Sequence, residues 1–122
     1  MLEGVLIAES LRVGAVLDEV PLRVGKIARV EVGGVGDGQP RQWTLVHFVA
    51  DERDAERLAG QLAGAVSPEG GWYVNYNTGA EAFVVFAGHV VRYPRGDAAG
   101  REEAKAYARG VGIPEGQLDW RD

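Results

Sequence analysis

The sequence predicts a single α+β domain, a two-layer sandwich in which a mainly antiparallel sheet of five to six strands carries two helices on one face. The first observation is length, because 122 residues correspond to one domain. The second is that six short segments show strand-like alternation or β-branched and aromatic enrichment. The third is that two segments with helical spacing each follow a strand and an aspartate, which gives the order βββαβββα.

Three strand-like segments precede the first helix pattern, at Val5–Val13, Leu22–Val32 and Gln42–Ala50. The apolar phase of the second segment changes near Gly25–Lys26, and a β-bulge would reconcile its two halves. The third segment is apolar on both alternating faces, which is typical of a central strand. Gly33–Pro40 lies between these two strands and reads as a loop, because no helix follows it to form a phosphate site.

Two helices are expected, over about Glu52–Val66 and Ala98–Val111. Asp51 and Asp97 immediately precede them, and aspartate is a preferred N-cap residue. Apolar residues then recur at helical spacing in each segment. The last segment, Ile113–Trp120, is expected to be a short turn docked on the body of the domain.

The three later strands are expected at Trp72–Asn77, Phe83–Phe86 and His89–Tyr93. Gly88 would supply the positive φ of a tight turn between the last two. The alternative is one long strand with a glycine bulge. We favour the hairpin, because a single strand running to Pro94 would be unusually long.

Composition excludes several classes of function. The chain has no cysteine, which removes disulfides and thiolate chemistry and fits a cytoplasmic protein. The net charge is −5 with mixed signs along the chain, so we expect no nucleic-acid partner. No apolar run approaches a membrane span, and we expect no membrane association. His47 and His89 have no second ligand at metal-binding spacing, so no metal or cofactor is expected.

The segment Arg92–Asp97 is the first candidate site. Arg92 and Arg95 precede a helix N-terminus, where backbone N–H groups favour an anion, so a small anionic ligand could bind there. With His89 as acid or base, the same corner could serve a small enzyme. The alternative is structural, with Asp97 as the helix cap and the two arginines paired with surface acids.

The second candidate site is a sheet face that carries Tyr73, Asn75, Asn77 and Tyr93. Phenols and carboxamides could line a pocket for a small polar ligand. They would equally suit a wet interface between two copies of the chain. We favour the interface.

These observations favour a non-enzymatic binding module that forms a homodimer through its sheet, because no catalytic residue set stands out. One alternative is an enzyme or binding protein for an anionic metabolite at Arg92–Asp97. Another is an immunity-type protein that neutralises a partner through its acidic surface.

Overall fold

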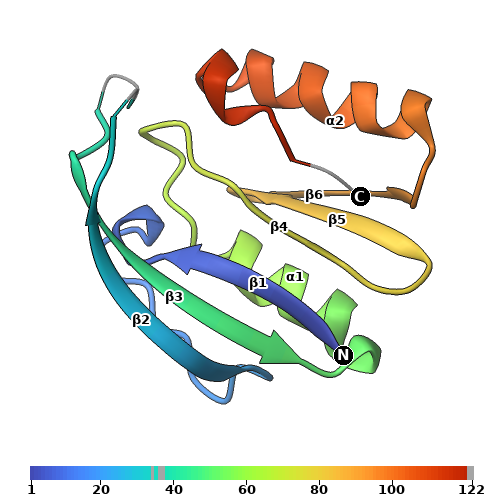
Figure 1. Ribbon diagram of the computed structural model, residues 1–122, viewed down its shortest axis with the longest axis horizontal. Helices are drawn as coiled ribbons and strands as arrows, with labels where there is room; N and C mark the ends of the chain where they lie inside the picture. Colours follow the sequence, from blue (N-terminus) through green and yellow to red (C-terminus); the bar gives the residue numbers. More distant parts are fainter. Residues whose placement is uncertain (34, 36–37, 121–122) are drawn as a thin grey trace.

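The computed structural model describes residues 1–33, 35 and 38–120. The predicted α+β class is confirmed, since these described residues form two α-helices and one antiparallel sheet of six strands in the order β2-β3-β1-β4-β5-β6 (Figure 1). The strands are β1 Leu2–Ile7, β2 Arg23–Glu31, β3 Gln42–Ala50, β4 Val74–Asn77, β5 Glu81–Phe86 and β6 His89–Pro94, and the helices are α1 Ala55–Ala63 and α2 Ala98–Gly110. Short 3-10 turns occur at Ala8–Ser10, Glu52–Asp54 and Glu115–Gln117.

The two helices pack against opposite faces of the sheet, which differs from the single helical layer expected from the sequence. On β5, Phe83 and Val85 belong to the core that contains α1, whereas Ala82, Val84 and Phe86 belong to the core that contains α2. Successive residues of a strand point to opposite faces. Because β5 is apolar at both parities, each of its faces needs a cover, and each helix supplies one.

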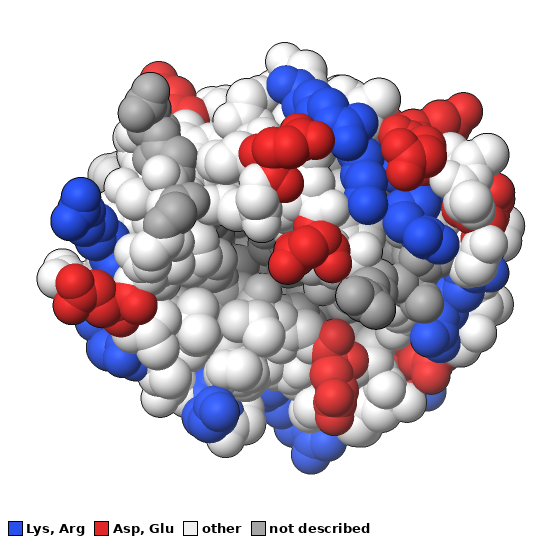
Figure 2. Space-filling view, turned by 45° about the horizontal axis from the view of Figure 1, so that its top comes forward, with Lys and Arg blue, Asp and Glu red and all other residues white. Residues whose placement is uncertain are grey.

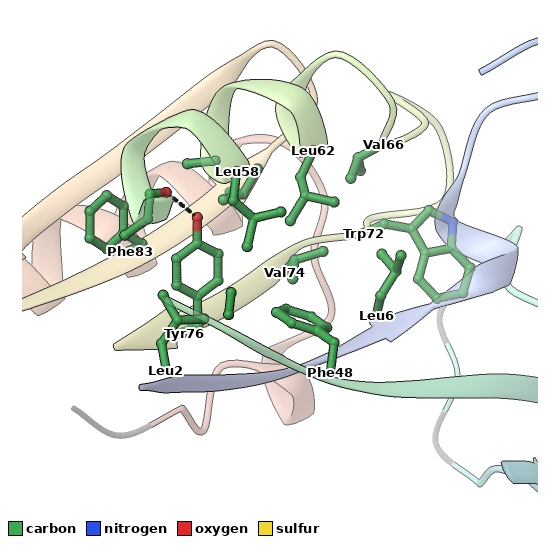
Figure 3. Close-up of a cluster of buried hydrophobic side chains, with 14 residues drawn as sticks. Leu2, Leu6, Phe48, Leu58, Leu62, Val66, Trp72, Val74, Tyr76 and Phe83 are labelled. Atoms are coloured by element: carbon green, nitrogen blue, oxygen red, sulfur yellow. Dashed lines mark hydrogen bonds between the residues drawn. The ribbon is translucent and has the colours of Figure 1, made fainter. Parts of the chain in front are cut away.

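The larger core lies between α1 and the sheet (Figure 3). Leu58 and Leu62 of α1 are fully buried there and face side chains of the central strands. The Tyr76 hydroxyl donates a hydrogen bond of 2.6 Å to the carbonyl oxygen of Ala55. This bond satisfies a buried phenol and fixes β4 against the first turn of α1.

The smaller core lies under α2. Ala104 and Ala108 of the helix are fully buried, and small side chains at these positions let the helix approach the sheet closely. Ile113, Leu118 and Trp120 complete this core, so the expected docking of the C-terminal segment is confirmed. The covered part of this face is formed by β5 and β6, which supply most of the strand residues of this core.

The first strand is shorter and begins earlier than the expected Val5–Val13. It ends at Ile7, where the chain enters a 3-10 turn. The reason lies in Glu9, whose carboxylate accepts hydrogen bonds from the Thr44 backbone N–H at 2.6 Å and from the Thr44 hydroxyl at 2.8 Å. A side chain therefore continues the hydrogen bonding to β3 where the β1 backbone stops.

The expected bulge in β2 is confirmed. The register against β3 shifts between Val24 and Lys26, which leaves Gly25 as the extra residue. The loop expected at Gly33–Pro40 follows β2, and its residues 34, 36 and 37 lie outside the described part of the chain.

Both aspartate caps and the hairpin turn are confirmed. Asp97 Oδ1 accepts hydrogen bonds from the backbone N–H groups of Ala99 and Gly100. Asp51 accepts one from Arg53, but the first helix opens with a 3-10 turn and its α-helical part is shorter than expected. Gly88 has φ +68° between β5 and β6, as the tight turn requires.

Candidate functional site

Half of the α2-side face carries no helix among the described residues. It is formed by β2, β3 and β1, which curve away from α2 in Figure 1. We call it the open half-face. Residues that are paired in register on neighbouring strands share a face of the sheet. The open half-face therefore consists of three rows, each with one residue from β2, β3 and β1: Arg23, Val49 and Glu3; then Lys26, His47 and Val5; then Ala28, Leu45 and Ile7.

Polarity changes along the open half-face. The row of Arg23 and Glu3 is charged, whereas the row of Leu45 and Ile7 is apolar. Val5 lies between them and is 39% exposed. Lys26 and His47 share its row, so the apolar area consists of Val5 and the adjoining end row, with charged residues next to it. An uncovered apolar area beside charges is typical of a surface that contacts another molecule.

A groove of about 470 Å³ runs from the apolar end of the open half-face to the C-terminal segment. Its floor includes Ile7 and Leu45, and its far wall includes Gln117 and Asp119. Figure 2 shows a hollow in the middle of this side of the molecule, surrounded largely by uncharged residues and with acidic side chains beside it. A second hollow of about 340 Å³, which includes Glu3, adjoins it at Val5.

Hydrogen bonds hold the walls of the groove in place. The Tyr73 hydroxyl donates to the carbonyl oxygen of Gln117. The side-chain amides of Gln39 and Gln117 bond to each other, with Gln117 Nε2 donating to Gln39 Oε1 at 2.9 Å and Gln39 Nε2 donating to Gln117 Oε1 at 3.3 Å. The Trp43 indole N–H donates to the carbonyl oxygen of Pro40 at 2.8 Å. The groove is therefore shaped before any ligand arrives.

Two of the residues predicted to bind a ligand, Tyr73 and Asn75, line this groove. Both are half-buried. Burial, with the nearby charge of Asp119 as a second cause, raises the pKa of Tyr73 to about 12. The phenol therefore stays neutral at physiological pH.

The arginines of the Arg92–Asp97 corner are engaged elsewhere. Arg92 donates to Glu81 at 2.8 Å and pairs with Glu56 at 3.3 Å, with its guanidinium carbon 4.7 Å from the centre of the Phe83 ring. Its hydrogen bonding to Glu81 raises the pKa of Arg92 further. Arg95 donates to the carbonyl oxygen of Thr78 at 3.2 Å. Arg92 is therefore paired with acidic residues, as the structural alternative expected, and these partners belong to β5 and α1.

The remaining predicted residues lie on the other side of β6. His89 stacks on Tyr107 of α2 with 4.1 Å between ring centroids. The Tyr93 hydroxyl is buried and accepts a hydrogen bond from the Trp120 indole N–H at 3.1 Å. The structure thus separates His89 from Arg92, which faces α1, and it does not gather the corner residues around one point.

Sequence reasoning missed the groove and two of its lining residues. Asp119 and Trp43 contribute to it but stand far apart in the chain. Trp43 sits in a segment that is apolar on both faces, so its pattern predicted burial and carried no sign of a groove. Asp119 lies next to two buried residues of the docked tail, Leu118 and Trp120, which was the one available hint.

Among the described residues, no group of three or more His, Cys, Asp or Glu side chains is placed to hold a metal ion. No helix in the described part of the chain is long and apolar enough to cross a membrane. Comparison with protein-family models, with curated proteins and with solved structures finds no match for this chain.

Proposed function

We propose that the protein is a non-enzymatic interaction module that forms a homodimer through its open half-face. The observation that carries the proposal is a three-strand surface with exposed Val5, an apolar row of Leu45 and Ile7 beside it, and no helix over it among the described residues, on a sheet whose strand β5 is covered on both faces. Burying this apolar area against a second copy removes it from water, which is the main driving force of association.

The charges on the open half-face of one copy would be complementary to those of a second copy. Basic Arg23 lies on β2 and acidic Glu3 lies on β1, in the same row on either side of Val49. A two-fold axis along β3 would place β2 of one copy over β1 of the other. Each Arg23 would then meet a Glu3 of the second copy, as an interface between identical patches requires.

Association through the sheet edges is less favourable than association through the face. The outer edge of β2 carries a bulge and the charged residues Lys26 and Arg29, and these features discourage strand pairing. The outer edge of β6 ends at Pro94, which has no N–H to donate.

Light scattering coupled to size-exclusion chromatography tests the proposal. The wild-type chain is expected to run as a dimer at tens of micromolar, and Val5→Asp is expected to run as a monomer because it places a carboxylate in the exposed apolar area. The matched control is Val13→Asp, which changes a fully exposed valine outside the open half-face and should leave the dimer intact. A monomeric wild-type chain would refute the proposal.

A further inference from the structure

The groove beside the open half-face combines aromatic rings with a single charge. Trp43, Trp72 and Tyr73 all line it. The carboxylate of Asp119 is the one charged side chain among its described lining residues, and no Lys or Arg lines the described wall. Aromatic faces and a carboxylate both attract a cation, so the two features favour the same class of ligand.

The other lining residues determine which chemical groups of a ligand could lie beside its cationic group. Ile7 and Leu45 form an apolar floor, and Asn75 adds one amide that can donate or accept a hydrogen bond. A hydrated metal ion gains little here, because one carboxylate and an amide are too few oxygen ligands for a hard cation. An anion would be repelled by Asp119.

We propose that this groove binds an organic cation, an ammonium group on a short apolar stem, with its charge near Asp119 and the aromatic rings and its stem on Ile7 and Leu45. The volume of about 470 Å³ accommodates a small molecule of this kind. The wall formed by Gln117 is fixed by the Tyr73 hydroxyl and by Gln39, so binding requires no prior ordering of the site.

This inference does not rest on the proposed dimer. A second copy seated on the open half-face would lie close to the groove, so the test uses Arg23→Glu, a variant that the dimer proposal expects to be largely monomeric. Arg23 does not line the groove. Light scattering on the same samples reports association separately, so failure of one proposal is distinguishable from failure of the other.

Choline is the probe, and 3,3-dimethylbutan-1-ol is its neutral isostere. Titration is followed by the indole N–H signals in nitrogen–proton correlation spectra, and Trp43→Phe identifies the signal of Trp43. Choline is expected to shift the Trp43 signal saturably and to bind at least ~5-fold more tightly than the neutral alcohol, because the alcohol lacks the charge.

Two variants that each remove one negative charge complete the test. Asp119→Asn is expected to weaken choline binding at least ~5-fold, while Glu3→Gln, outside this groove, is expected to leave it unchanged. The unchanged remainder of each spectrum verifies folding. The inference would be overturned if choline and the alcohol bound equally well or if the Trp43 signal did not shift. It would also be overturned if Asp119→Asn and Glu3→Gln had equal effects.

Discussion

Glu9 shows how one side chain sets the end of a strand. Its carboxylate accepts from both the backbone and the hydroxyl of Thr44, and it pairs with Arg29 at 2.9 Å. Desolvation is the largest single influence on the pKa of Glu9 and raises it, but the hydrogen bonds and the Arg29 charge together hold that pKa below its ordinary value. A carboxylate with a lowered pKa stabilises the fold above its unfolded-state pKa, and this contribution is lost as the pH falls through the folded-state value.

Glu9→Gln is therefore expected to lower the free energy of unfolding by about 1 kcal/mol at neutral pH, because the charged acceptor is lost. The difference from wild type should shrink at an acidic pH below the lowered folded-state pKa of Glu9, where Glu9 itself becomes protonated. Urea unfolding at the two pH values measures both effects. Glu103→Gln, on the exposed side of α2, is the control and should change little. A difference that persists in acid would contradict this account.

The start of α2 shows how an element depends on one cap. Asp97 accepts from two N–H groups of the first turn, which have no partner within the helix. Asp97→Ala should cost about 1 kcal/mol of stability, whereas Asp97→Asn should cost only a few tenths, since asparagine is also a good cap. Urea unfolding of both variants checks this, with amide exchange in α2 as a local readout. Equal losses in the two variants would show that the cap is not the cause.

Elements were predictable from the sequence where local chemistry determines them. The phase change at Gly25–Lys26 predicted the β2 bulge, Asp97 predicted a helix start, and Gly88 predicted a hairpin turn. The placement of the helices was not predictable in this way. The run 82–86 is apolar at both parities, as a strand covered on both faces requires, but it does not indicate which elements cover it.

The candidate site was predictable only in part, for the same reason. Tyr73 and Asn75 alternate on one strand face, so they could be assigned to a common surface from spacing alone. Asp119 joins them through tertiary packing of the C-terminal segment, which no spacing rule encodes. The sequence left open whether Arg92 pairs with surface acids or binds an anion, and its acidic partners Glu81 and Glu56 come from another strand and from the other helix.

At the scale of the whole molecule, the open half-face has opposite charges on its two flanks. Glu3 and Lys26 form no ion pair with another described residue, and Arg23 donates only a long hydrogen bond to the Met1 sulfur at 3.8 Å. These side chains can therefore meet a second copy without breaking contacts of their own. Reversing one sign should place like charges together across the two-fold axis, and reversing both should restore attraction.

We expect Arg23→Glu alone and Glu3→Arg alone each to dimerise at least ~10-fold more weakly than wild type, because each creates two like-charge contacts per dimer. An equimolar mixture of the two variants should recover a one-to-one heterodimer, since a chain with two acidic flanks then faces a chain with two basic flanks. Native mass spectrometry separates this heterodimer from either homodimer if one chain carries a tag. Recovery in the mixture would assign the contact to these two flanks of the sheet. Dimers that persist in both single variants would place the interface elsewhere.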